Sequence, residues 1–414
     1  METYRFQTLL AYGLFGMPLA LVALPVYVYV PHFYVQHFSL SLSAIGGILL
    51  AARLFDAFLD PALGSWLDRS ASADRYGKAV NISLPFLVLG LSGLLLPPTI
   101  AANFPLAWLL GTLLVVYLGF SMATIAHQSW GAALTQSQTQ RSRLTATREA
   151  CGLLGVILAA ILPGTLGLQW LPLIFTFILF STALVLRSAP RPLLVSAVKP
   201  NSAAVAAFEP FRNNRFRWLF AIFMLNGIAS AIPATLFLFF VDDRLQLAAY
   251  GGPLLVLYFV AGAASMPGWY LLARRYGEAR AWRIAMLLTI CVFIRAYGLS
   301  AGDLLPFATI CALSGIALGA DLALPPALLA AVIGKAGHSG QKEGAYFGIW
   351  NWGTKMNLAL AAGIALPMLQ FLGYLPGSAN HAGVEALSCA YALLPCALKL
   401  LAALMLWRAP VADI

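Results

Sequence analysis

Residues 105–127 read PLAWLLGTLLVVYLGFSMATIAH, and none of these side chains is an Asp, Glu, Lys or Arg. About 20 consecutive apolar residues are enough for a helix to cross the hydrocarbon core of a bilayer, so this stretch predicts a transmembrane helix. Apolar runs of similar length recur along the whole chain. The predicted spans are 7–30, 42–67, 79–98, 105–127, 144–167, 169–187, 217–241, 251–273, 282–300, 305–333, 344–371 and 384–407.

The composition supports an all-α membrane protein with twelve transmembrane helices. Hydrophobic residues make up 61% of the 414 residues and charged residues 10%, whereas soluble domains carry about 25% charged residues. The sequence contains no P-loop, nucleophile-elbow or zinc-protease motif. We therefore expect no enzyme activity, no cofactor and no resident metal. The five cysteines fall inside apolar runs and are expected to be small buried side chains.

The formal charge of +10 is spread over the short gaps between the apolar runs. Arg75 and Lys78 lie between the second and third runs, whereas Arg244 is the one basic residue in the gaps that should face the opposite side. This asymmetry follows the positive-inside rule and places both termini in the cytoplasm. It argues against nucleic-acid binding and favours a multi-pass protein of a cell inner (plasma) membrane, which we expect to be monomeric.

The longest polar stretch lies in the middle of the chain and is interrupted by prolines. It predicts a six-helix bundle over residues 1–188, a cytoplasmic linker over 189–216 and a second six-helix bundle over 217–414. A short repeat supports two related halves. The sequence GSWLDR at 64–69 precedes RYGK at 75–78, and GWYLL at 268–272 precedes RRYG at 274–277. Such halves are typical of major facilitator transporters, which bind substrate between them. The predicted gating motif comprises Gly64, Asp68, Arg69 and Arg75.

Charged side chains inside a span are costly and therefore indicate function. The second span carries Arg53, Asp56 and Asp60, which share one helix face at about 100° per residue. Two carboxylates one turn apart in a low dielectric need a compensating cation, so Asp56 and Asp60 form the predicted site for H⁺ or Na⁺. The alternative is an Arg53–Asp56 salt bridge that only holds helices together. The lack of an evident third oxygen ligand slightly favours H⁺.

The eleventh span carries Lys355 near its middle, together with Tyr346, Trp350 and Asn351. A buried lysine either loses its proton or pairs with a carboxylate. We expect Lys355 to couple cation and substrate by pairing with Asp56 or Asp60, and a pair with Asp321 is the alternative. Tyr346, Trp350 and Asn351 are candidate substrate contacts.

Three further spans contribute candidate substrate contacts. Arg148 can reach an anionic or hydroxyl-rich group, although a pair with Glu149 near the helix end is the alternative. Trp130 can stack on a sugar ring, but tryptophans are also common at membrane interfaces. Asn226 can face the cavity or bond to another helix. The neighbouring His127 is expected to be hydrogen-bonded within the bundle.

At this point the sequence resembles the glycoside–pentoside–hexuronide:cation symporter family of the major facilitator superfamily. The resemblance is carried by RLFDAFLDPALG at 53–64, RYGK at 75–78, Trp130, Arg148 and YFGIWNWGTK at 346–355. It implies an alternating-access symporter driven by a sodium or proton gradient. By position, Asp56 and Asp60 match the cation-site carboxylates of the family and Lys355 its lysine between cation and substrate. Trp130 and Arg148 match sugar-pocket residues.

Two departures concern the substrate. The sugar transporters of the family have an acidic residue in the first span where this chain has Pro18, and an aspartate where it has Ala126. Without these acids, an anionic solute is favoured beside Arg148. We predict symport of a small organic solute, a glycoside or a sugar-derived acid. A lipid, lysolipid or drug exporter of the same fold is the alternative, and a membrane enzyme or a transport-inactive sensor are minor ones.

Overall fold

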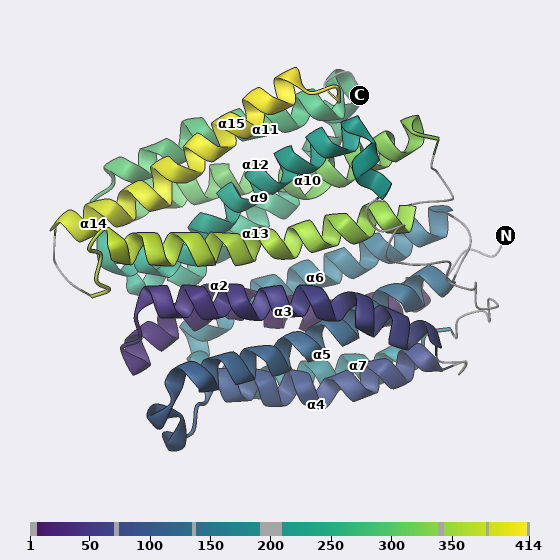
Figure 1. The fold of residues 1–414 in the computed structure, drawn as a ribbon, viewed down its shortest axis with the longest axis horizontal. Helices are drawn as coiled ribbons and strands as arrows, with labels where there is room; N and C mark the ends of the chain where they lie inside the picture. The colour runs from purple at the N-terminus through teal and green to yellow at the C-terminus, as the bar shows by residue number, and fades with distance from the viewer. Residues whose placement is uncertain are drawn as a thin grey trace. The chain divides into compact units, whose positions relative to one another are not determined.

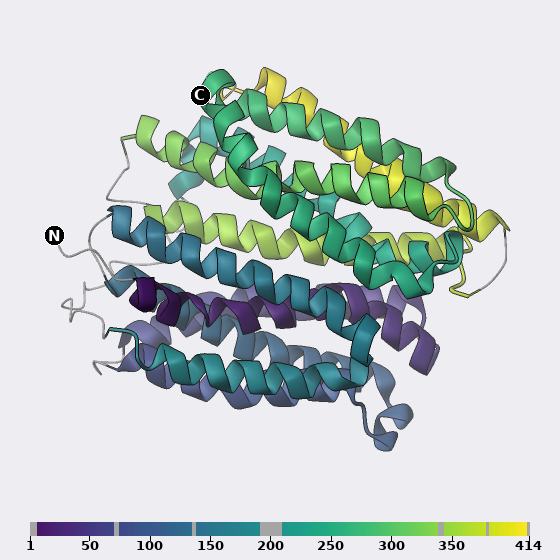
Figure 2. The same ribbon diagram turned by 180° about the vertical axis from the view of Figure 1, so that it is seen from behind.

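The computed structural model describes residues 6–69, 74–134, 138–190, 209–337, 343–377 and 381–411. The described residues are mostly helical, and the helices of each unit run roughly side by side (Figures 1 and 2). The chain divides into two compact units. The first comprises Met1–Leu40 and Ile48–Lys199, and the second Ser41–Gly47 and Pro200–Ile414.

The helices of the first unit follow the apolar runs. They are α1 (Phe6–Gly13), α2 (Gly16–Phe38), α3 (Leu42–Arg69), α4 (Arg75–Leu95), α5 (Pro105–Leu134), α6 (Gln138–Leu166) and α7 (Leu171–Leu186), with short 3-10 turns η1 (Thr99–Asn103) and η2 (Leu168–Trp170). The first turn of α3 belongs to the second unit. Because α1 and α2 follow each other with a two-residue break, together they form the first span.

The helices of the second unit are α9 (Asn214–Phe239), α10 (Gly251–Tyr276), α11 (Glu278–Phe293), α12 (Leu304–Lys335), α13 (Glu343–Phe371), α14 (His381–Ser388) and α15 (Leu394–Arg408). Short turns connect them: η3 (Glu209–Arg212), η4 (Phe240–Arg244), η5 (Ala248–Tyr250), η6 (Ile294–Gly298) and η7 (Cys389–Leu393). α9 contains Pro233 within the helix and continues to Phe239.

Eleven helical stretches within the described residues are long and apolar enough to cross a membrane. The one predicted span outside this set is the eleventh, 344–371. It corresponds to α13, a helix of 29 residues that carries Lys355 and several polar side chains. The prediction of an all-α fold built from long apolar helices is therefore confirmed.

The same helix packing recurs in both units. In the first unit, α2 of the first span packs on α6 of the fifth span. In the second unit, α9 of the seventh span packs in the same way on α13 of the eleventh span. Likewise α4 packs on α5 and α11 on α12. Glycines permit the closest approach: a Cβ on Gly119 of α5 would lie 2.9 Å from the main-chain nitrogen of Leu87 in α4.

The cysteines are more varied than expected. Cys151, Cys311 and Cys396 are buried, whereas Cys389 is half-buried and Cys291 is exposed. The expectation that all five are buried was therefore wrong for Cys291. An apolar run shows that a helix lies in the membrane, but a run that is apolar all round does not show which face is covered by other helices.

Candidate functional site

The carboxylate of Asp56 lies in the middle of α3 and is fully buried. The Ser121 hydroxyl of α5 donates a hydrogen bond of 2.6 Å to its Oδ1. A serine hydroxyl also has lone pairs, so this pair can present oxygen atoms from two helices to a cation.

Arg53 lies one turn before Asp56 and is also buried. Its Nη1 is 3.8 Å from Asp56 Oδ2, which is an electrostatic contact beyond hydrogen-bonding distance. Its guanidinium also lies over the ring of Tyr117, 4.2 Å from the centroid, in a cation–π arrangement. The predicted Arg53–Asp56 pair therefore exists, with the arginine shared between a carboxylate and an aromatic ring.

Asp60 lies one turn further along α3 and is half-buried as a residue, although its Oδ1 is buried. The side chains of Gly64, Asp68 and Arg69 lie outside the described residues. Arg75, the last residue of the predicted gating motif, begins α4, and its Nη2 donates a hydrogen bond of 2.9 Å to Tyr76 Oη.

The two predicted sugar-pocket residues of the first unit make other contacts. Trp130 of α5 is buried, and its indole Nε1–H donates a 3.0 Å hydrogen bond to the carbonyl of Pro190. Arg148 of α6 forms a salt bridge of 2.5 Å with Glu149, which was the alternative reading of this residue. In this conformation Trp130 contributes to packing within its unit, and substrate contact by either residue stays a prediction.

His127 of α5 is hydrogen-bonded to Tyr12, which lies near the end of α1. Its Nε2 lies 2.9 Å from the carbonyl oxygen of Tyr12, and because a carbonyl only accepts, Nε2 carries the proton. The Tyr12 hydroxyl in turn donates to the His127 carbonyl at 3.1 Å. The fully buried imidazole thus pairs with a main-chain group near the end of α1, in agreement with the expected structural role.

A buried polar network joins four helices of the second unit. Lys399 of α15 donates to Asp321 Oδ2 of α12 at 2.9 Å and to Asn226 Oδ1 of α9 at 2.8 Å. Asp321 Oδ1 accepts from Asn226 Nδ2 at 3.0 Å and from Trp282 Nε1 of α11 at 2.7 Å. The Ser230 hydroxyl lies 3.5 Å from Oδ2. Asp321, considered as an alternative partner for Lys355, is thus paired with Lys399, and the amide of Asn226 belongs to this network.

The other candidate residues of the second unit lie on α13. Tyr346 and Trp350 are buried. The Tyr346 ring contacts Phe216 edge-on, with 5.0 Å between ring centroids. The Trp350 ring stacks on Phe223, with 3.8 Å between centroids. Asn351 is exposed and Lys355 half-buried, so these two occupy a more accessible face of the helix. The proposed pairing of Lys355 with Asp56 or Asp60 joins the two units and stays a prediction.

Comparison with known proteins identifies the family. A family model described as MFS/sugar transport protein matches residues 10–413. The chain belongs to this family. Two curated relatives are the uncharacterised symporter YjmB of Bacillus subtilis (strain 168) and a glucuronide carrier protein homolog of Escherichia coli (strain K12). The first is 22% identical over 86% of this chain and 82% of the relative. The second is 25% identical over 90% and 85%.

Solved structures of the major facilitator type share the fold. The nucleoside transporter NupG superposes with a TM-score of 0.71 at 14% identity, covering 98% of this chain and 99% of that one. A D-xylose–proton symporter gives 0.70 at 13% identity, with 97% and 96% covered. These matches confirm the predicted major facilitator fold. The family model and the two curated relatives confirm the resemblance to the glycoside–pentoside–hexuronide:cation symporter type and show a membrane transporter for sugars or related solutes.

Sequence reasoning missed three polar residues of this family member. Lys399 carried the same signal as Lys355, an isolated lysine within a predicted span, and could have been found. Trp282 lies at the edge of its span and resembled an interfacial tryptophan. Ser121 gave no distinctive signal, because serine is common in apolar helices; its role follows from its 2.6 Å bond to Asp56.

Proposed function

We propose that the chain is a secondary active symporter that couples H⁺ or Na⁺ to the movement of a small organic solute, a glycoside or a sugar-derived acid. The observation that carries the proposal is the fully buried Asp56 carboxylate beside the Ser121 hydroxyl. A buried acid in a membrane span is retained at considerable cost. The names of the two relatives, a symporter and a glucuronide carrier homolog, support symport and a sugar-derived acid as the solute.

In the proposed cycle, Asp56 and Asp60 take up the cation and release Lys355 from its ion pair. The protein then becomes competent to bind solute, and the loaded protein opens to the other side of the membrane. Cation and solute are coupled because each favours the same conformation. The Ser121 hydroxyl supplies an oxygen beside the carboxylates that the sequence prediction lacked, so Na⁺ becomes as good a candidate as H⁺. We place the working protein, as a monomer, in the inner membrane with both termini in the cytoplasm.

The test is uptake by the full chain reconstituted in liposomes. A panel of glucuronides, uronic acids and glycosides is offered with an inward Na⁺ gradient, an inward H⁺ gradient, or none. We expect at least one solute to accumulate against its gradient. Asp56→Asn keeps the shape and one acceptor oxygen, so it should fold, lose accumulation more than tenfold and still exchange solute across the membrane without a gradient.

Glu385→Gln is the matched control, since it also removes one carboxylate but at an exposed position of α14. It should accumulate solute like the wild type. Full accumulation by Asp56→Asn would remove that residue from the cation site. Solute movement that runs opposite to the cation would replace symport by the antiport expected of an exporter.

A further inference from the structure

The second unit has a cavity of about 570 Å³ where α9 begins and α12 ends. It is lined by Arg212, Asn213, Asn214, Arg215, Val332, Lys335, Ala336 and Pro410. Three of these eight residues are cationic and none is acidic. A concave surface lined by one sign of charge raises the local concentration of ions of the opposite sign, so the cavity is suited to an anion.

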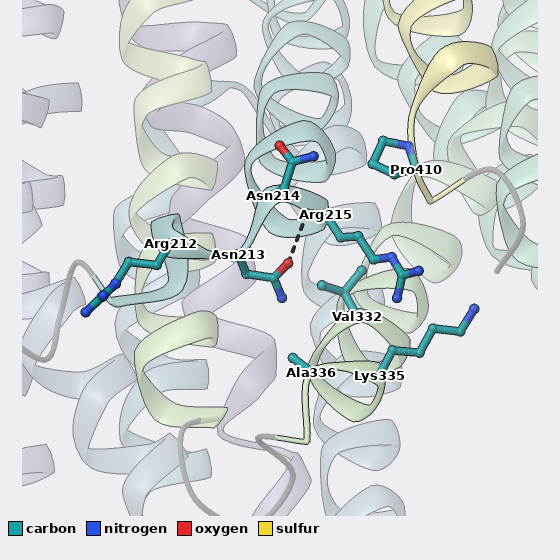
Figure 3. A pocket seen from close by; sticks show the side chains of 8 residues that line it. All are labelled: Arg212, Asn213, Asn214, Arg215, Val332, Lys335, Ala336 and Pro410. Atoms are coloured by element: carbon teal, nitrogen blue, oxygen red, sulfur yellow. Dashed lines mark hydrogen bonds between the residues drawn. The ribbon is translucent and has the colours of Figure 1, made fainter.

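Two of the cations are placed to share one anion. Figure 3 shows the side chains of Arg215 and Lys335 extending along the same side of the cavity, whereas the Arg212 guanidinium extends away from them. Arg215 and Lys335 are both exposed at their positions, so their charged groups are accessible. A guanidinium fork binds phosphate oxygens with two parallel hydrogen bonds, and an ammonium binds them as a compact point charge.

The main chain adds to the positive potential. The cavity lies at the N-terminus of α9, a helix of 26 residues, and the N-terminus of a helix carries a partial positive charge. Asn213 caps this end, with its side-chain oxygen accepting from the Arg215 main-chain nitrogen at 3.0 Å. This cap holds the first turn of α9 in place, with the positive end of the helix at the cavity.

The position of the cavity along the helices indicates the source of the anion. Three apolar helices end beside it: α9 begins at Asn214, α12 ends at Lys335 and α15 ends two residues before Pro410. On α15, Trp407 is 66% exposed, as is typical of tryptophans at the level of lipid headgroups. The cavity therefore lies at the membrane–water interface, where the phosphates of lipids are the most abundant anions.

We propose that this cavity binds the phosphate of an anionic phospholipid, with Arg215 and Lys335 as its cationic ligands. Val332 and Pro410 form an apolar side of the same cavity, which suits the glycerol end of the lipid. Basic pockets between membrane helices bind acidic headgroups by this combination of charges and apolar contacts. Bound lipid would stabilise the second unit by linking the ends of α9, α12 and α15.

The test measures thermal unfolding of the purified full chain in phosphatidylcholine micelles, with phosphatidylglycerol or inorganic phosphate added. A ligand that binds the folded state raises the unfolding temperature by mass action. We expect phosphatidylglycerol to raise it, and Arg215→Gln/Lys335→Gln to lose at least half of that rise. Because both residues are exposed, the variant should remain folded in phosphatidylcholine. The matched control, Arg274→Gln/Arg275→Gln, removes two charges at the end of α10 and should keep the full rise.

A second measurement counts phosphatidylglycerol molecules that remain with each variant after purification. Fewer in the cavity variant than in the control supports the site. Equal retention and an equal temperature rise in both variants would overturn it. If inorganic phosphate alone raises the unfolding temperature and phosphatidylglycerol adds nothing, the lipid assignment is wrong and the site binds free anions.

Discussion

Replacing Lys399 by Met tests whether the buried network of the second unit is an ion pair that the fold depends on. The substitution removes an ammonium that is bonded to Asn226 at 2.8 Å and to Asp321 at 2.9 Å. Met has a similar length and apolar stem, so the loss of packing is small. The Asp321 carboxylate remains in place, 14% exposed, without its cationic partner.

Breaking a buried ion pair on one side costs about 3–5 kcal/mol, because a charge is left uncompensated. Asp321 keeps the donors Trp282 and Asn226 at 3.0 Å or less, so we expect the lower end, about 3 kcal/mol. For a unit of about 200 residues this lowers the unfolding temperature by roughly 6–12 °C. Asp321→Asn combined with Lys399→Met leaves neutral partners and should be more stable than either single variant.

The assay is thermal and denaturant-induced unfolding of the wild type, the two single variants and the double variant in the same detergent. Lys78→Met is the control, because Lys78 is exposed near the start of α4; we expect a change of about 0.5 kcal/mol or less. The reasoning is refuted if Lys399→Met unfolds like the wild type. It is also refuted if the double variant is less stable than both single variants.

Two further predictions concern hydrogen bonds at helix ends. His127→Leu should lose about 1–3 kcal/mol of unfolding free energy, because the Tyr12 carbonyl loses its donor, whereas His127→Gln can retain one; equal stability of the two variants would contradict this role. Burial, and then the hydrogen bond to Asp243, raise the pKa of Tyr374 well above its ordinary value. The folded state therefore keeps this proton above about pH 10, where the unfolded chain loses it, so unfolding free energy should fall as pH rises beyond 10. Tyr374→Phe should show a smaller fall in titrations followed by denaturant unfolding, and an unchanged slope would exclude a contribution from this residue.

The fold could be predicted from the sequence because each span must satisfy its main chain within one helix. Helix ends were less well predicted, since apolar runs mark the hydrocarbon layer and helices continue into the polar region. The run 105–127 belongs to α5, which continues to Leu134, and the run 144–167 belongs to α6, which begins at Gln138.

The candidate site was only partly predictable. In helices that are apolar all round, the sequence pattern does not show which face of the helix packs against its neighbours. The importance of Asp56 could be deduced, since a charge within a span is conspicuous in any orientation. A tryptophan can serve equally well as a substrate contact or as a packing residue. The sequence therefore could not show that both Trp130 and Trp350 are buried. The partner of Asp321 depends on which helix is adjacent, and α15 is far from α12 along the chain.

The carboxylates of Asp56 and Asp321 differ in a way that bears on the coupling ion. The close partners of Asp321 are the Trp282 indole N–H, the Asn226 amide N–H and the Lys399 ammonium, which are donor groups without a lone pair for a cation. The Ser230 hydroxyl lies further away, at 3.5 Å. Asp56 is bonded to the Ser121 hydroxyl, which has lone pairs and can turn from donor to ligand. Both carboxylates have a basic side chain nearby, but the Lys399 ammonium is bonded to Asp321 at 2.9 Å, whereas Arg53 Nη1 lies 3.8 Å from Asp56, beyond hydrogen-bonding distance. A cation entering near Asp56 would therefore find oxygen ligands that are not occupied by a bonded ammonium. The chemistry of the partners, more than burial itself, therefore favours cation exchange in the first unit and a permanent structural ion pair in the second.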